Sequence, residues 1–310
     1  MTDAPSTSGT PTSARLTLLL CLGALYFIWG TTYLAMRVVV LEVSPFLMGS
    51  ARFLLAGTVL TVVMRVRGSP WPTLREWLWA APVGTCLFVL GNGLVGLAEQ
   101  KVSSAAAAVV CATTPLCAAA LAPFFGERFR RQEVLGTVLG VLGVVVLFSG
   151  AEFKAELKSA LILAVAPIGW ALGSLLTRRL PLAKGLMSAA TQMVTGGLVM
   201  GLVAAVRGEL AVPSPSPAAI GSWIYLVLFG SLVSFSAYNW LLRNARPALA
   251  MSYSYVNPAV AVAIGAFIGR EQLGPEMLPA LLLVTLATVA TVKARTTPAP
   301  STVSAEPERA

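Results

Sequence analysis

Ten long apolar stretches dominate this sequence of 310 residues and limit what it can fold into. A helix needs about 20 mostly apolar residues to cross about 30 Å of hydrocarbon. No segment alternates in the manner of a membrane-spanning strand, so backbone polar groups at membrane depth must be paired within helices. The sequence therefore predicts an all-α membrane protein with ten transmembrane helices. The predicted spans are 16–36, 45–66, 77–98, 103–124, 134–150, 157–177, 186–206, 222–242, 248–268 and 275–292.

The composition excludes several classes of function. Hydrophobic residues make up 56% of the chain and charged residues 11%, against roughly 45–50% and 25% in soluble domains. The chain has no histidine, which removes imidazole metal ligands, general bases and proton relays. The G-x-G-x-x-G pattern at 91–96 lies inside a predicted span, where it does not indicate a dinucleotide site. We therefore expect a protein that is not an enzyme and holds no cofactor or metal.

The distribution of Lys and Arg predicts the orientation in the membrane. Of the 22 basic residues, 15 lie in the tails and loops of one side and 6 on the other, and Arg52 lies inside the second span. The basic side faces the cytoplasm, so both termini are predicted to be cytoplasmic in a multi-pass inner-membrane protein. The Ser/Thr/Pro-rich segments 1–15 and 293–310 are predicted to be disordered tails. The net charge of +9 needs no nucleic-acid partner.

The chain also contains an internal duplication. Trp29 and Arg37 in the first span recur as Trp170 and Arg178 in the sixth. The offset stays between 140 and 143 residues along the chain. Each copy, 16–150 and 157–292, has five spans, and because five is odd the copies are predicted to be inverted. Such repeats build carriers with a midplane site. The alternative is a duplication that only enlarged the bundle.

Several segments resemble a known family. They are LYFIWGTTYLAMR (25–37), ARFLLAG (51–57), GNGLVGLAEQKVSSA (91–105), ATTPL (112–116), FFGERF (124–129) and YVNPAVAVAIG (255–265). Together they resemble the EamA family of the drug/metabolite transporter superfamily, in its YedA-like exporter branch. The resemblance implies two EamA repeats, with the fifth and tenth helices at the periphery. In one departure, the second copy reads Gly-Arg-Glu at 269–271 where the first has Gly-Glu-Arg at 126–128.

Charged residues within spans are the leading candidates for a functional role. The planar guanidinium of Arg52 could bind a carboxylate or phosphate, or it could snorkel or pair structurally. Its repeat partner is the neutral Gln192. Asn92, Gly96 and Glu99 share one face of the third helix. Glu99 is a candidate counter-charge for Arg52 and a candidate proton-coupling group; the alternative is a loop acid beside Lys101.

Further candidates are polar and aromatic residues on the predicted inner faces. The predicted substrate-binding residues, besides Arg52, are Tyr26, Trp29, Tyr33, Asn92, Thr114, Trp170, Gln192, Tyr238, Asn239, Tyr253 and Asn257. Each could instead form interhelical hydrogen bonds. Pro115 and Pro258 fall at matched mid-span positions and are predicted to kink their helices. The four cysteines lie in spans and are interpreted as packing residues rather than a disulfide set.

These patterns predict a secondary transporter that exports small metabolites or drugs across the cytoplasmic membrane by alternating access. One alternative is an importer or exchanger of an amino-acid-like solute. A more distant alternative is an integral-membrane lipid-modifying enzyme. The expected partners are a small-molecule substrate and the lipid bilayer, with a homodimer possible and no nucleic acid.

Overall fold

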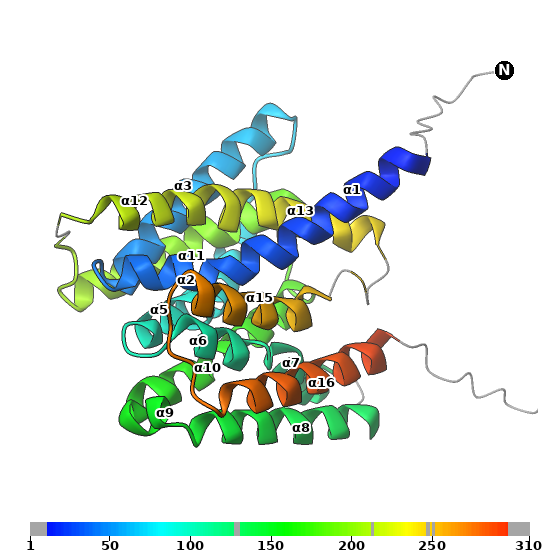
Figure 1. Ribbon diagram of the computed structural model, residues 1–310. Coiled ribbons are helices and arrows are strands. Elements are labelled where there is room, and N and C mark those ends of the chain that lie inside the picture. The colour runs from blue at the N-terminus through cyan, green and yellow to red at the C-terminus, as the bar shows by residue number, and fades with distance from the viewer. Residues whose placement is uncertain (1–10, 127–130, 212–213, 246–248, 250–251, 297–310) are drawn as a thin grey trace, which may run out of the picture.

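The computed structural model describes residues 11–126, 131–211, 214–245, 249 and 252–296, and this part of the chain contains helices and no strand. The helices lie side by side in one bundle (Figure 1). In the first repeat they are α1 (Pro11–Ala24), η1 (Leu25–Trp29), α2 (Gly30–Val40), α3 (Pro45–Val66), α4 (Leu74–Gly84), η2 (Thr85–Gly93), α5 (Leu94–Glu99), α6 (Ser104–Cys111), α7 (Thr114–Leu121), η3 (Ala122–Phe125) and α8 (Arg131–Phe148).

The second repeat follows the same plan. The short helix α9 (Ala151–Ala155) connects the two repeats. The helices of the second repeat are α10 (Leu157–Thr177), α11 (Leu186–Val206), α12 (Pro217–Tyr225), η4 (Leu226–Val233), α13 (Ser234–Asn244), α15 (Tyr253–Phe267) and α16 (Met277–Thr296). Three predicted spans, 45–66, 157–177 and 186–206, agree with α3, α10 and α11 to the residue.

Eight helical runs among the described residues are long and apolar enough to cross a membrane. The two other predicted spans correspond to shorter apolar helices, Glu133–Phe148 and Tyr253–Phe267. The first helix begins at Pro11, five residues before the predicted start. Residues 1–10 and 297–310 of the predicted tails lie outside the described part.

Local capping signals fix where several helices begin. Ser44 accepts a hydrogen bond from the backbone N–H of Leu47, and Pro45 occupies the first turn of α3. Thr73 forms a capping box with Glu76 at the start of α4. Hydroxyl caps of this kind satisfy backbone donors that a helix leaves unpaired at its N-terminus. The helix boundaries at these positions therefore follow from local chemistry.

Helices that are equivalent in the two repeats pack against each other. α3 packs on α11, α6 on α15, and α8 on α16. The contact of η2 with α10 is matched by the contact of α12 with α2, as expected if an approximate two-fold axis exchanges the repeats. α8 and α16 lie together along the lower edge of the bundle in Figure 1.

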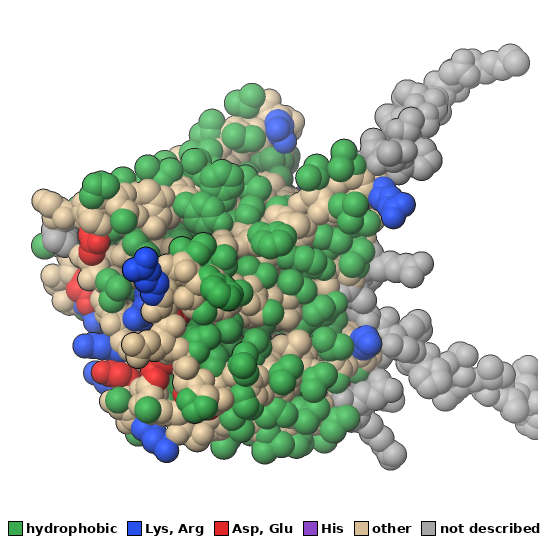
Figure 2. Space-filling model, viewed as in Figure 1, with side chains coloured by type: hydrophobic (Ala, Val, Ile, Leu, Met, Phe, Trp, Pro, Cys, Tyr) green, Lys and Arg blue, Asp and Glu red, His purple; other side chains and the backbone are tan. Residues whose placement is uncertain are grey.

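The two ends of the bundle differ in what they carry. α1 begins and α16 ends on the right of Figure 1, and we call this side the termini end. α10 begins beside α9 on the opposite side, the far end, so the first helix of each repeat runs in a different direction. Apolar side chains cover the middle of the molecule in Figure 2, and the acidic side chains visible there gather at the far end.

Interruptions of regular helix occur at matched places in the repeats. The π-helical segments η2 and η4 lie in equivalent helices. Pro167 in α10 corresponds to the π-helical segment η1 of the first helix. With its amide nitrogen turned toward that segment, Asn257 donates to the carbonyls of Leu25 (3.2 Å) and Tyr26 (3.3 Å). Wide turns of this kind leave carbonyls free for partners on other helices.

The two matched prolines lie at different places in their helices, one in a first turn and one in the interior. The helix of the fourth span ends at Cys111 and restarts at Thr114, with Pro115 in the first turn of α7. Pro258 lies inside α15, which continues through it from Tyr253 to Phe267. A proline in the first turn costs no backbone hydrogen bond, whereas an interior proline does.

Candidate functional site

A cavity of about 1290 Å³ lies in the middle of the bundle. Its lining comes mainly from the first four and the sixth to ninth spans of the chain. α8 and α16 contribute Glu133, Thr291 and Val292, which agrees with their position at the edge of the bundle. A volume of this size exceeds the range of roughly 300–1,000 Å³ that is typical of small-molecule sites.

The cavity reaches the surface at the termini end. Its lining there includes Arg178, which is exposed, and Leu182 and Gly185 in the segment after α10. In the other direction the lining stops at Met36 and Val95, which are 5% and 4% exposed. The cavity is therefore accessible from the termini end and blocked before the far end.

A set of polar contacts closes the far end; we call it the far-end network. Glu271 accepts hydrogen bonds from the backbone N–H groups of Ser104 (2.8 Å) and Ala105 (3.1 Å). Its carboxylate also lies 3.5 Å from Nε of Arg37. Arg37 donates in addition to the backbone carbonyls of Glu99 (3.2 Å) and Val102. A carboxylate at a helix N-terminus is favoured by the helix dipole, so Glu271 joins α6 to the end of the ninth span and to the first helix.

Further carboxylates tie loops together at the same end. Glu152 accepts hydrogen bonds from the backbone and hydroxyl of Ser103. The carboxylate of Glu42 accepts hydrogen bonds from the backbone N–H and the hydroxyl of Ser216 at the start of α12, both at 2.6 Å. Hydrogen bonds from the Ser216 hydroxyl and backbone lower the pKa of Glu42. This tie therefore stabilises the fold above the ordinary carboxyl pKa and is lost as the pH falls through the lowered one.

Two equivalent arginines are in opposite situations. Arg37 belongs to the far-end network, and its side chain is 25% exposed. Arg178, its counterpart in the second repeat, is exposed at the mouth of the cavity and makes no ion pair with any described residue. The two repeats therefore share this arginine in sequence, but its contacts and exposure differ between them.

Arg52 lies in the wall of the cavity and is 4% exposed. Its Nε donates to the hydroxyl of Ser231 at 3.0 Å. The guanidinium fits beside Gly230, where an added Cβ would lie 3.1 Å from Nη2. Arg52 forms no ion pair with a described carboxylate, so the expected pair with Glu99 is wrong. Glu99 is 0% exposed and lies outside the cavity lining, and neither of its carboxylate oxygens has a hydrogen-bond partner among the described residues.

Four aromatic rings form a cluster next to Arg52; we call it the aromatic box. Trp29 lies at ring-centroid distances of 5.6 Å from Phe235, 5.6 Å from Tyr238 and 4.8 Å from Tyr253. Its indole Nε1 donates to the carbonyl of Gly230 at 3.2 Å. That hydrogen bond fixes the indole beside the Arg52 site, and all four rings contribute to the cavity wall.

The equivalent residues of the other repeat form a second, neutral group. Trp170 and Gln192, which correspond to Trp29 and Arg52, line the cavity together with Gly91 and Asn92. An added Cβ on Gly91 would lie 2.8 Å from the indole of Trp170. Gln192 donates to the hydroxyl of Ser188 at 2.8 Å. The cavity thus has two related half-sites, one with a cation and one without.

The structure brings most of the predicted site residues to the cavity. The predicted residues that line it are Trp29, Tyr33, Arg52, Asn92, Thr114, Trp170, Gln192, Tyr238, Tyr253 and Asn257, with Pro115 and Pro258. Tyr26 lies outside the lining and bonds to the hydroxyl of Ser252 at 2.5 Å. The side chain of Asn239 lies outside the described residues. Glu99 is a buried residue at the end of α5 rather than an exposed loop acid.

Several lining residues were not predicted. Ser174 and Ser188 lie four positions from Trp170 and Gln192 on the same helices, a spacing that places them on the same faces. Arg178 was recognised only as part of the repeat. Glu133 was placed just outside a span, although it is 1% exposed and lines the mouth.

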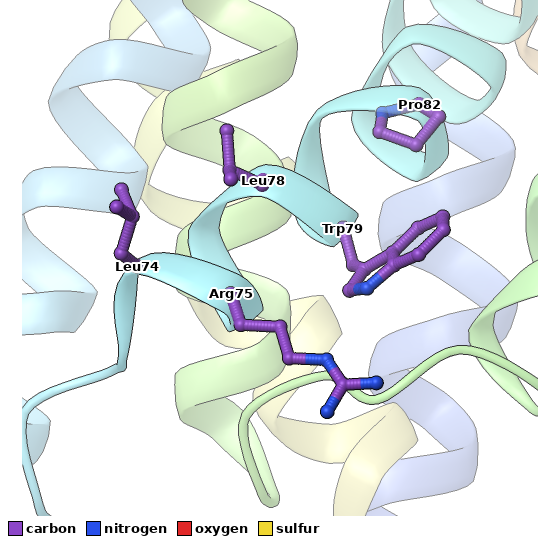
Figure 3. Close-up of a pocket in the computed structure, with 5 residues that line it drawn as sticks. All are labelled: Leu74, Arg75, Leu78, Trp79 and Pro82. Carbon is purple, nitrogen blue, oxygen red and sulfur yellow. The ribbon is translucent and has the colours of Figure 1, made fainter.

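A second hollow belongs to the surface rather than to this site. It lies along α4, where Figure 3 shows Arg75 and Trp79 extending to the same side of the helix. Leu74, Leu78 and Pro82 complete its lining, and none of the five residues lines the central cavity. A tryptophan and an arginine near a span end are typical of a membrane interface.

Comparisons with known proteins agree with this architecture. The EamA-like transporter family matches residues 16–149 and again 157–293. The chain is 39% identical to the uncharacterized inner membrane transporter YedA of Escherichia coli K12, over 86% of this chain and 87% of that protein. It is 24% identical to protein PecM of Dickeya dadantii, over 83% and 86%. One protein of known crystal structure has the same fold, with a TM-score of 0.60 at 19% identity over 93% of this chain and 99% of that one.

Proposed function

The chain belongs to the EamA-like transporter family and is a membrane transporter, and from that premise we propose that it is a secondary carrier that exports a small amphipathic solute by alternating access. The observation that carries this proposal is a central cavity that reaches one end of the bundle and stops at a contact network at the other. A carrier needs a site that faces one compartment at a time.

The relation between the repeats supports the proposal. The first helix of each repeat runs in the opposite direction (Figure 1), and equivalent helices pack against each other. Arg37 is held in the closed end while its counterpart Arg178 is free of described ion pairs at the open end. Exchange of the conformations of the two repeats would close the open end and open the closed one. We therefore propose ten spans in two inverted repeats.

The orientation in the membrane follows from the positive-inside rule. The termini end carries the larger share of Lys and Arg, so we place it in the cytoplasm. The structure then corresponds to the inward-facing state, in which an exported solute is loaded. An importer of an amino-acid-like solute would use the same two states in the reverse order, and the sidedness of transport in proteoliposomes distinguishes the two.

Thiol labelling tests alternating access directly. In a cysteine-free background, Ser104→Cys reports on the far end, where Ser104 is 0% exposed, and Ser188→Cys reports on the cavity wall. During transport of a solute, an impermeant thiol reagent on the far side should label Ser104→Cys faster, and one on the termini side should label Ser188→Cys more slowly. If the labelling rates of both cysteines change in the same direction during net transport, or if neither rate changes, alternating access is contradicted.

Glu99 gives a prediction about energy coupling. The groups that act electrostatically on this buried carboxyl are Arg37, Glu271, Tyr33 and Cys111. A change in its protonation alters the charge beside the far-end network, so proton binding there can bias the two states. We expect Glu99→Gln to remove the dependence of transport on a pH gradient while solute exchange continues.

The matched control for that prediction is Glu156→Gln. Glu156 is partly exposed at the same end of the bundle, at the boundary between α9 and α10. Uptake is measured in proteoliposomes with and without an imposed pH gradient. If Glu99→Gln retains the full response to the gradient, Glu99 is not the coupling group.

A further inference from the structure

We propose that the cavity selects a solute with one negative charge on a flat apolar body, and that Arg52 and the aromatic box bind this end while the Gln192 half-site binds a neutral end. This inference rests on the proposed carrier function and assigns the class of solute. The carboxylate of the solute would occupy the space in front of the Arg52 guanidinium.

The first argument is a missing counter-charge. Arg52 is 4% exposed within a span and forms no ion pair with any described residue. An arginine at membrane depth costs about 2.5–3.5 kcal/mol even on insertion scales. Among the described carboxylates, Glu133 lines the cavity at its mouth, and Glu99 lies outside the lining in the far-end region. One uncompensated positive charge calls for one negative charge on the ligand.

The second argument is the geometry of the guanidinium. Ser231 accepts a hydrogen bond from Nε, and this contact fixes the plane of the group. The two terminal nitrogens have no hydrogen bond to a described residue. A guanidinium with two free N–H groups on one edge matches the two oxygens of a carboxylate. Because a dianion such as a phosphate monoester would leave one negative charge unmatched, the site favours the carboxylate.

The third argument is the aromatic box beside the cation. The indole N–H of Trp29 donates to the carbonyl of Gly230. Because Gly230 has no side chain, the guanidinium of Arg52 fits beside it. The rings of Phe235, Tyr238 and Tyr253 surround the indole at 4.8–5.6 Å. Aromatic surfaces of this kind bind flat apolar groups by offset or edge contacts. An apolar body attached to the carboxylate would therefore lie against the box.

The half-site of the other repeat determines the orientation in which the solute binds. Gln192 and Asn92 offer amide donors and acceptors where the first half-site has Arg52 and Ser231. A second carboxylate at these amides would meet no cation, because the other cation of the lining, Arg178, lies eight residues along the chain from Trp170, at the mouth. We therefore expect the bound solute to be neutral at that end and to occupy the cavity in one orientation.

The experiment is a binding measurement on the purified, detergent-solubilised full chain. Isothermal titration calorimetry compares 3-phenylpropionate with its amide, its amine analogue and phenyl phosphate. The wild type should prefer the carboxylate to the amide by about 10- to 100-fold, the value of one hydrogen bond to a charged group. Arg52→Gln should abolish this preference.

A matched pair of substitutions separates charge from shape. Ser231→Asp places a carboxylate next to Nε of Arg52, and Ser231→Asn places a neutral group of the same size there. We expect Ser231→Asp to lose the preference for the carboxylate and Ser231→Asn to keep it. Exchange of the half-sites in the double variant Arg52→Gln, Gln192→Arg should restore the preference, because the cation then lies in the other repeat.

The outcomes distinguish this inference from the carrier function. An unchanged carboxylate-to-amide ratio in both Arg52→Gln and Ser231→Asp overturns the assignment of the solute class, even if neutral solutes are transported. Stronger binding of phenyl phosphate than of 3-phenylpropionate overturns the choice of a single charge. Selective binding of the carboxylate without transport of any solute overturns the carrier function and leaves the subsite standing.

Discussion

Replacing Glu271 with alanine is expected to open the end of the bundle that the structure holds closed. The substitution removes the acceptor of two backbone N–H groups at the start of α6 and the partner of Arg37. The Glu271 side chain is 6% exposed, so little water replaces these contacts. Hydrogen bonds to charged groups are worth about 1.5–3 kcal/mol. Labelling of Ser104→Cys from the far side, without solute, should therefore rise about 10- to 100-fold.

Glu271→Ala should also change transport of the solute. A carrier whose far end no longer closes lets solute exchange across the membrane without completing the cycle, so concentrative transport is lost and passive leak of the solute increases. The matched control is Glu209→Gln at the same end, where Glu209 pairs with the 44% exposed Arg207 at 2.6 Å. Exposed pairs contribute about 0–1 kcal/mol, and glutamine keeps an acceptor for the Ser44 hydroxyl that donates to Glu209, so this variant should behave as wild type. Unchanged labelling in Glu271→Ala would show that the far-end network does not hold the closed state.

Replacing Gly84 with valine should prevent the repeats from docking. A Cβ at this position would lie 2.5 Å from the carbonyl oxygen of Gln192 and 2.8 Å from the backbone nitrogen of Gly196. A Cβ on Gly196 would in turn lie 2.7 Å from the carbonyl oxygen of Gly84. Both contacts involve backbone, which cannot move aside as a flexible side chain can. Small residues let membrane helices approach this closely, and overpacking such a contact costs about 1–3 kcal/mol or more.

The measurement is the amount of monodisperse protein after solubilisation, together with its thermal unfolding midpoint. Gly221→Val is the matched control because Gly221 lies on an apolar helix with open space at the Cβ position. We expect a large loss for Gly84→Val and a near-normal yield for Gly221→Val. Normal yield and stability of Gly84→Val would mean that α4 and α11 can separate without cost.

The sequence predicted the helical bundle well because hydrophobic length depends on the bilayer, which is the same for every span. The boundaries of α3, α10 and α11 agree with the prediction, and family membership agrees with the resemblance. The break after Cys111 and the π-helical segments could not be predicted. They depend on contacts with other helices, and no local propensity distinguishes them from regular helix.

The site was predictable to the extent that helical spacing defines a face. Trp29 and Tyr33 share a face and both reach the cavity. Tyr26 shares that face too, but its hydroxyl bonds to Ser252 at the start of α15, and it lies outside the lining. Glu99 was placed at a plausible depth, and only the tertiary structure could separate it from Arg52. Ion pairs between distant segments, such as Arg37 with Glu271, depend on how the repeats dock.

The wide turns of the helices around the cavity place part of its recognition chemistry in the main chain. The Gly230 carbonyl lies in the cavity wall and accepts the indole N–H of Trp29, and the Leu25 and Tyr26 carbonyls behind the wall accept from the lining residue Asn257. Peptide oxygens of this kind are present whatever side chain occupies the position. An alanine scan of the wall would thus leave these acceptors in place and undercount what the solute meets. Because these acceptors do not depend on side-chain identity, substitutions in the wall can change specificity while this polar frame stays in place.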